Sequence, residues 1–334
     1  MILVAYGDEP RLVDAVESAQ VRSANDPSVE VVVVDNGLPA ERRRALEGRA
    51  GVRVVGDGTN LGFADGANLG AERSTGRVVV FLNQDASLRP GCLRHLADAA
   101  RRPGVGLATA SVRLADHPDL LNSAGNVLNV FGHSWAGHLG EPAAAAGLVE
   151  SDVLLASGCC FAVSRAVWDD LGGFFGPLFM YYEDAELSLR AHLYGLTVRY
   201  VPDAVVLHHY RTNFGAWKIG LADRNRRAVL LTTFRTRTLL LLSPLLVVAE
   251  IGSVAHGIVH RHLRATLGGW RWLLRHRRVL AAHRRTVQHR RRTPDASILA
   301  RMSTALPPLG PSGPVSAGLE RALRPVQRFL IRIG

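Results

Sequence analysis

Residues 29–37 read Val-Glu-Val-Val-Val-Val-Asp-Asn-Gly, a valine run that stops at a turn. Other short valine-rich runs alternate with helical stretches, the runs at 2–6, 52–55 and 78–82 and the helices at 10–24, 39–49 and 64–74. Continuous apolar strands that alternate with helices indicate an α/β fold, a mainly parallel sheet with helices on both faces. Such sheets bind ligands at the carboxyl ends of their strands, so we expect the site in the loops that follow them.

Three of these loops carry polar residues suited to a ligand. Asp35 ends the valine run, and its carboxylate fits either a hydrogen bond from a ribose or base or an Asx turn. The loop at 56–70 lacks the third glycine of a dinucleotide fingerprint, but its glycines favour close approach of the backbone to phosphate or sugar. After the run at 78–82, Asn83 and Asp85 alternate along an extended segment. Their oxygens suit Mg²⁺ or Mn²⁺ carrying a diphosphate, or the segment is only a turn.

The stretch Phe-Met-Tyr-Tyr-Glu-Asp-Ala-Glu-Leu-Ser-Leu-Arg at 179–190 places three carboxylates, Glu183, Asp184 and Glu186, on the expected first turn of a helix. The helix dipole favours acidic residues there, so one interpretation is a well-capped helix with a Glu186–Arg190 pair. A glycine-rich loop precedes this helix. That context favours a second interpretation, a general base that meets a substrate hydroxyl.

Further strands are predicted at 105–112, at 154–163 with a helix from Ser164, and at 197–202 with an end in the run 204–210. His208 and His209 lie in that last run, where an imidazole serves a metal or a phosphate or is merely structural. His133 and His138 are too loosely spaced to predict a metal site.

The positive charge is concentrated towards the C-terminus. The chain has 334 residues and a net charge of +11, and Glu250 is the single acid between Arg224 and Arg292. This excess predicts a polyanionic partner, either anionic lipid or nucleic acid. The three cysteines form neither a disulfide framework nor a CxxC pair, which favours a reducing compartment, and we expect no secretory signal at the start.

Taken together, these segments resemble the family 2 glycosyltransferases of the GT-A fold, and among them the bacterial rhamnosyltransferase-like enzymes that build cell-surface polysaccharide. The resemblance covers roughly residues 1–230. It rests on eight segments in the family's order, at 31–36, 60–70, 81–86, 157–165, 171–174, 179–190, 208 and 224–226.

The resemblance implies roles on the donor side of the site. It implies that Tyr6 and Asp35 contact the nucleoside. It also implies a donor pocket between Asn60 and Asn68, lined by Asn60, Gly62, Phe63 and Asn68.

The resemblance also implies a metal and a base. Asn83 and Asp85 stand at the first and last positions of a DxD-type motif, so Asp85 would bind Mg²⁺ or Mn²⁺ and His208 would assist the metal or the diphosphate. Asp184, beside Glu183, would deprotonate the acceptor hydroxyl. A single in-line displacement would then invert the anomeric configuration.

The C-terminal part predicts a membrane-associated region. Residues 239–259 are mostly apolar and long enough to span a bilayer, but polar and helix-breaking residues interrupt them, so we expect an interfacial or re-entrant segment. Residues 267–278 are basic, amphipathic and contain tryptophan, a pattern that favours anionic lipid. The alternative is a helical domain with a solvated basic face. The predicted domains are a catalytic domain at 1–215, a membrane-associated region at 216–292, and a linker with an amphipathic helix at 293–334.

These patterns predict an inverting, metal-dependent transferase at the cytoplasmic face of the cell membrane. It would move rhamnose or a similar sugar from a dTDP- or UDP-sugar to a polyprenyl-linked or polysaccharide acceptor. One alternative is a nucleic-acid- or lipid-binding protein that uses the arginine-rich tail. We expect no nucleic acid, because the basic region lacks interleaved aromatic residues and an apolar run interrupts it. Another alternative is an inactive scaffold, against which Asp85 and Asp184 argue.

Overall fold

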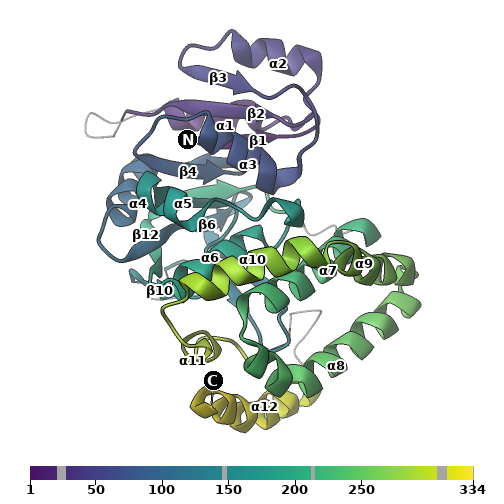
Figure 1. Cartoon of the computed structure of the whole chain (residues 1–334). Coiled ribbons are helices and arrows are strands. Elements are labelled where there is room, and N and C mark those ends of the chain that lie inside the picture. Colours follow the sequence, from purple (N-terminus) through teal and green to yellow (C-terminus); the bar gives the residue numbers. More distant parts are fainter. Residues whose placement is uncertain (21–27, 145–148, 212–214, 307–313, 334) are drawn as a thin grey trace. The chain divides into compact units, whose positions relative to one another are not determined.

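The computed structural model describes residues 1–20, 28–144, 149–211, 215–306 and 314–333. The chain divides into two compact units (Figure 1). The sheet unit comprises Met1–Asn126, Ala136–Ala191 and Leu196–Arg211, and the helical unit comprises Val127–Trp135, His192–Gly195 and Thr212–Gly334. The domain division at 215 and 292 stays a prediction.

Within the described residues, ten strands form one mixed sheet, in the order β10-β12-β6-β11-β4-β1-β2-β3, with β5 beside β12 and β7 beside β6. β8 and β9 pair separately. The strands are β1 (Ile2–Ala5), β2 (Val31–Asp35), β3 (Val52–Val55), β4 (Val78–Leu82), β5 (Ala86–Leu88), β6 (Val105–Leu114), β7 (His117–Ser123), β8 (Asn126–Leu128), β9 (Ser134–Ala136), β10 (Ser151–Val153), β11 (Cys160–Ser164) and β12 (Thr197–His208). Six of the ten, β1 to β4, β6 and β12, run in one direction, so the predicted α/β fold is confirmed.

Several predicted strands end elsewhere, for local reasons. β12 is one strand whose register against β6 shifts between Val201 and Val205, around Pro202, because a proline has no N–H to donate to the ladder. β11 begins only at Cys160, so most of the predicted strand from Leu154 is a loop.

Helices cover both faces of the sheet (Figure 1). In the sheet unit they are α1 (Leu12–Gln20), α2 (Ala40–Glu47), α3 (Gly62–Glu72), α4 (Cys92–Ala100), α5 (Arg165–Leu171) and all but the last two residues of α6 (Glu183–Leu193), with a short 3₁₀ turn at Gly176–Leu178. Leu3 and Val33 share a core with Leu12 of α1 and Leu96 of α4. Ile2, which points to the other face, packs closely on Gly70 of α3. Because successive strand residues point to opposite faces, valine runs are buried on both.

The helical unit contains α7 (Ala216–Thr233), α8 (Thr236–Val259), α9 (Leu263–Arg275), α10 (Arg277–Arg290), α11 (Asp295–Leu299) and α12 (Pro314–Ile333). A charge cluster joins α7 to α8. Arg227 donates to Glu250 (Nε–Oε2 2.9 Å), and Arg226 donates to Asp223 (Nη2–Oδ1 3.1 Å) and also to Glu250. The one acid of the apolar helix α8 is therefore neutralised from α7.

Among the described helices, α8 is long and apolar enough to cross a membrane by length and composition, with a mean hydropathy of 2.0 over its most apolar window. Only 11% of that window is buried. Leu240, Val247, Ile251 and Ile258 are all at least 57% exposed, and their spacing places them on one face of the helix.

Candidate functional site

A strained turn presents the acidic helix α6. Phe179, Tyr181 and Tyr182 have φ values of 68°, 66° and 68°, a region that residues other than glycine rarely occupy. Phe179 has ψ −65° and Met180 N donates to Leu178 O at 2.8 Å, so Phe179 is the centre of a γ-turn of the rare, strained kind. Strained backbone of this kind clusters at functional sites because surrounding structure has to hold it in place.

Asp184 lies in the first turn of α6, and a neighbouring loop holds its carboxylate. Oδ2 accepts hydrogen bonds from Gly158 N at 2.8 Å and from Asn126 Nδ2 at 3.3 Å. A Cβ at Gly158 would lie 3.0 Å from this oxygen, so a side chain there would crowd the carboxylate. Asp184 is partly exposed, which leaves it able to meet a substrate.

Glu183, directly before it, is only 6% exposed, and its Oε2 has no hydrogen-bond partner among the described residues. Burial, together with the charge of Asp184, raises the pKa of Glu183 well above its usual 4.5. Burial also raises the pKa of Asp184, but the N–H groups of Ala185 and Gly158 stabilise its anion. A proton shared by the pair therefore resides on Glu183, and Asp184 is the carboxylate.

The predicted Glu186–Arg190 pair is also present, one turn further along α6. Arg190 Nε donates to Glu186 Oε1 at 3.1 Å, and Glu186 is fully buried. Arg190 also donates from Nη2 to Gly173 O at 2.8 Å, so the pair fixes the glycine loop before the helix. The structural interpretation of the acidic stretch thus applies to Glu186.

Asp85 and His208 meet where β4 and β12 end. Asp85 Oδ1 lies 3.3 Å from His208 Nε2, and His208 Nδ1 lies 2.8 Å from Asn122 Oδ1. Burial would raise the pKa of Asp85, but the hydrogen bond and charge of His208 outweigh it and the pKa is lowered.

This donor set fits a divalent ion in part. A carboxylate oxygen and an imidazole nitrogen are both ligands of Mn²⁺, and an ion that carries a diphosphate takes its remaining ligands from phosphate oxygens and water. In the described part of the chain, no group of three or more His, Cys, Asp or Glu side chains could hold a metal by itself.

A backbone contact joins the two parts of the site. Asn83 N, two residues before Asp85, donates to Cys159 O at 2.9 Å, and Cys159 follows the Gly158 that holds Asp184. Asp85 and Asp184 therefore flank one loop, at the edge where the parallel strands have their carboxyl ends.

Asp35 forms an Asx turn. Its Oδ1 accepts from Gly37 N at 3.1 Å and Leu38 N at 2.8 Å, and its Oδ2 accepts from Arg43 Nη1 at 2.6 Å. Burial would raise the pKa of Asp35, but these N–H groups and Arg43 outweigh it and the pKa is lowered. Of the two interpretations, the structure contains the turn. A contact with the nucleoside stays a prediction.

Gln84, between Asn83 and Asp85, has a contact that the sequence did not predict. Its side chain pairs with the backbone of Tyr6, accepting from Tyr6 N at 2.9 Å and donating to Tyr6 O at 3.1 Å. The Tyr6 ring is 56% exposed and lies against Gly37. Tyr6 is therefore accessible beside the Asp35 turn, and its contact with the nucleoside stays a prediction.

The glycine-rich loop after β3 is held by its own side chains and by the strained turn. Asn60 Oδ1 accepts from Gly62 N at 2.9 Å, and Asn36 Oδ1 accepts from Leu61 N at 2.7 Å. Gly62 has φ +76°, and a Cβ there would come within 2.4 Å of the Phe179 ring. The backbone approach that this glycine permits is therefore to Phe179.

Asn68 and Phe63 tie α3 to the glycine loop before α6. The amide of Asn68 pairs with the backbone of Phe174, at 2.9 Å to N and 3.0 Å to O, and the Phe63 ring stacks edge-on against Phe174 at 5.9 Å. These contacts give both residues a structural role, and their place in a donor pocket stays a prediction.

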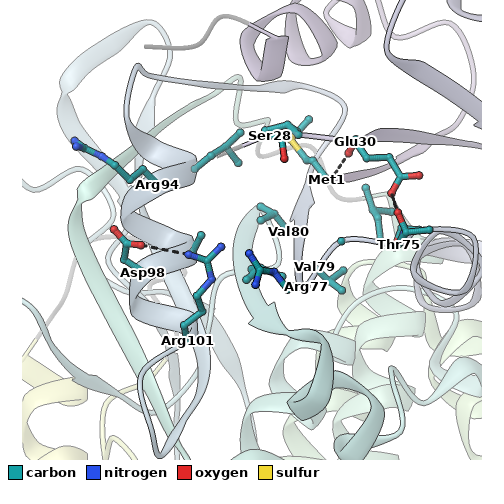
Figure 2. A pocket seen from close by; sticks show the side chains of 17 residues that line it. Met1, Ser28, Glu30, Thr75, Arg77, Val79, Val80, Arg94, Asp98 and Arg101 are labelled. Atoms are coloured by element: carbon teal, nitrogen blue, oxygen red, sulfur yellow. Dashed lines mark hydrogen bonds and ion pairs between the residues drawn. The ribbon is translucent and has the colours of Figure 1, made fainter. Parts of the chain in front are cut away.

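A hollow of about 850 Å³ lies at the opposite edge of the sheet, where β1 and β4 begin (Figure 2). Arg77, Arg94 and Arg101 line it, and Arg101 pairs with Asp98 at 3.6 Å. None of the predicted site residues lines this hollow.

Comparison with known proteins gave a consistent set of similarities. The model of the family described as "Glycosyl transferase family 2" matches residues 1–172. The N-acetylglucosaminyl-diphospho-decaprenol L-rhamnosyltransferase of Mycobacterium tuberculosis is 30% identical over 234 residues, 63% of this chain and 75% of that protein. The O-antigen biosynthesis protein RfbC of Myxococcus xanthus is 28% identical over 234 residues, 66% of this chain but 18% of that protein.

Solved structures share the fold at low sequence identity. A crystal structure of GalNAc-T7 with UDP, GalNAc and Mn²⁺ superposes with a TM-score of 0.55 at 15% identity, over 69% of this chain and 48% of that one. A crystal structure of S. aureus TarS gives 0.54 at 13% identity, over 99% of this chain and 88% of that one. The predicted fold class is thereby confirmed.

Proposed function

The chain belongs to glycosyl transferase family 2, and from that premise we propose that it is an inverting, metal-dependent glycosyltransferase. The donor is a dTDP- or UDP-sugar carrying rhamnose or a similar sugar, and the acceptor is a polyprenyl-linked or polysaccharide hydroxyl. The name of the M. tuberculosis relative, a rhamnosyltransferase acting on a decaprenol diphosphate, supports both choices.

One observation carries the proposal: Asp184, the proposed base, and the Asp85–His208 pair, the proposed metal ligands, flank the same loop. Asp184 Oδ2 accepts a hydrogen bond from Gly158 N at 2.8 Å. The backbone N of Asn83, two residues before Asp85, donates to Cys159 O in the same loop. Inverting sugar transfer needs a base on one side of the anomeric carbon and a group that binds the diphosphate on the other. Both groups must therefore lie beside the same bound sugar.

The chemistry follows from the state of the acidic pair. Asp184 takes the proton of the acceptor hydroxyl, whose oxygen then bonds to the anomeric carbon. The bond from that carbon to the diphosphate oxygen breaks, and its electron pair leaves with the nucleoside diphosphate. Neutral Glu183 adds no second negative charge beside the base. A divalent ion held by Asp85 and His208 would neutralise the leaving diphosphate.

The helical unit supports contact with an anionic membrane, proposed here at the cytoplasmic face. The apolar face of α8 is exposed, and exposed arginines lie at both of its ends, Arg235 just before the helix, Arg237 in its first turn and Arg261 after it. On α9, Leu267 and Leu274 are exposed, whereas Trp272 is stacked under Arg224 at 4.1 Å. Apolar residues with flanking cations are typical of helices that lie in a membrane interface.

The proposal is tested by thermal stabilisation of the full chain. dTDP, UDP, GDP and NAD are each added with and without Mn²⁺, beside an Asp85→Ala control. We expect a rise in Tm with dTDP or UDP that needs both Mn²⁺ and Asp85. If none of the four nucleotides raises the Tm, the proposed donor class is wrong.

Membrane contact is tested by co-sedimentation with vesicles. We expect the full chain to pellet with vesicles containing anionic lipid more than with neutral ones, and Ile251→Asp on the exposed face of α8 to reduce pelleting. A short DNA duplex serves as the competing polyanion. Release from vesicles by DNA at equal charge would favour the nucleic-acid alternative.

A further inference from the structure

The segment Leu-Asn-Ser-Ala-Gly-Asn at 121–126 contacts both parts of the site, Asp184 through Asn126 and His208 through Asn122. It joins the end of β7 to the start of β8. We propose that this segment is a positioning element for sugar transfer, in which Asn126 orients the base Asp184 and Asn122 orients the ring of His208. The inference rests on the proposed function and assigns residues that the family resemblance did not.

Asn126 is fixed so that its NH₂ group faces the carboxylate. Its Oδ1 accepts from Ser123 Oγ at 2.9 Å, which leaves Nδ2 to donate to Asp184 Oδ2 at 3.3 Å. Its backbone N donates to Leu155 O at 2.9 Å, so the residue cannot rotate freely. A hydrogen bond to an ionised oxygen stabilises the anion, so Asn126 favours the ionised form of Asp184.

Asn122 has the equivalent place on the metal side. It is 3% exposed, and its Oδ1 lies 2.8 Å from His208 Nδ1. An oxygen on that side accepts from Nδ1–H, so the proton that a metal would displace from the ring is the one on Nε2, which lies 3.3 Å from Asp85 Oδ1. Metal-binding histidines commonly have such a second partner, and it fixes both tautomer and ring orientation.

The sheet makes the segment stiff enough for this role. Ser123 is registered opposite Val112 and Leu121 opposite Arg113 of β6, with irregular register between them. Gly125 has φ +92°, and a Cβ there would lie 3.0 Å from Val153. Because Asn122 and Asn126 are four residues apart on this support, the base and the leaving-group ligand are positioned by one piece of backbone.

The Asn126 contact is tested by carboxyl ¹³C NMR of the full chain, with the Asp184 resonance assigned from Asp184→Asn. Asn126→Ala is expected to raise the pKa of Asp184 by roughly 0.5–1 unit, and isosteric Asn126→Asp by more, because it replaces a donor with a like charge. Asp119→Ala, an exposed change on the preceding strand β7, is the control and leaves the pKa unchanged.

An unchanged pKa in Asn126→Ala would overturn this half of the inference. The acid limb of kcat/KM is expected to move with the pKa while the KM for the nucleotide sugar stays constant, which a merely structural loss of stability would not produce. If the pKa moves but no nucleotide sugar is turned over by the wild type, the proposed function fails and the contact stands.

The Asn122 contact is tested by Mn²⁺ binding, followed as loss of the free-ion EPR signal in the presence of UDP or dTDP. Asn122→Leu is expected to weaken binding by about tenfold or more, whereas Asn122→Asp, which keeps an acceptor for Nδ1–H, restores it. Wild-type affinity in Asn122→Leu, or no Mn²⁺ binding by the wild type, would overturn this half.

Discussion

Two buried acids three residues apart at the start of α6, Glu183 and Glu186, have opposite surroundings. Glu186 is fully buried and paired with Arg190, whereas Glu183 is 6% exposed and its Oε2 has no partner among the described residues. A buried carboxylate with a cation is ionised and structural. A buried carboxylate beside another one, with no cation, keeps a proton and changes the chemistry of its neighbour. Arg190 therefore gives Glu186 a structural role, whereas Glu183, beside Asp184, belongs to the candidate site.

The sharpest test of this comparison is Asp184→Asn. Loss of a general base costs about 10²–10⁴ in rate, so we expect kcat for sugar transfer to fall by about 10³ or more. The fold should survive, because an amide oxygen still accepts from Gly158 N. The measurement is initial rate with Tm as the control. Retention of a tenth of the activity would place the base elsewhere.

Arg190→Met tests the structural pair of Glu186 and Arg190. It leaves Glu186 buried without its cation and releases the Gly173 carbonyl, so we expect a loss of about 3–4 kcal/mol in unfolding free energy. Denaturant unfolding measures it. The double variant with Glu186→Leu is the control and should recover most of the loss. A double variant no more stable than the single one would show that the charge is not the cause.

Gly158→Ala tests how closely the base is held. The added Cβ would lie 3.0 Å from Asp184 Oδ2, so the carboxylate or the loop must shift. We expect a fall in kcat of about 10-fold, close to 1.4 kcal/mol, with little change in the KM for the donor. Steady-state kinetics with both substrates separate the two. A change confined to the donor KM would contradict the assignment of this loop to the base.

Glu183→Gln gives the smallest effect and tests the proton. The folded-state pKa of Glu183 is raised above 4.5, so its folded form binds a proton more tightly than the unfolded chain does. Wild-type stability from this group is present below pH 4.5 and declines as pH rises towards the folded pKa. Glutamine cannot ionise, so the variant should gain stability relative to wild type as pH rises from about 4 to 8.

Urea unfolding across that pH range measures the difference, with Glu47→Gln as an exposed control. We expect activity to fall by less than about tenfold, since Asp184 rather than Glu183 is proposed to accept the acceptor proton. Equal stability of variant and wild type at every pH would show that Glu183 is ionised in the folded protein.

The sequence predicted the parts of the fold that repeat locally. β3 and β4 have the bounds of the predicted runs at 52–55 and 78–82. A run of apolar residues bounded by turn residues predicts a strand without knowledge of the strands beside it. The strand predicted at 154–163 was wrong for residues 154–159, which form a loop before β11. Those residues are apolar because they lie under α6, where Ala156 N donates to Ser188 Oγ, rather than because they pair in the sheet.

Residues of the candidate site could be predicted from the sequence only where they lie close together in one short segment. Glu183 and Asp184 are adjacent, and Asn83 and Asp85 nearly so. The contacts that orient them are long-range: Asn126 lies 58 residues from Asp184, and Asn122 lies 86 residues from His208. No periodicity or spacing encodes such contacts. Gln84 was missed for the same reason, because its partner Tyr6 lies 78 residues away.

The contact between Gly62 and the strained turn at Phe179 limits how this scaffold can be re-engineered. Ala64 N also donates to Phe179 O at 2.9 Å, so the loop proposed to hold the donor and the turn that precedes the proposed base Asp184 are fixed to each other. A chimaera that imports residues 56–70 from a relative with different donor preference should fail unless residues 176–182 come with it. Donor and acceptor preference would thus be inherited together rather than exchanged as separate modules.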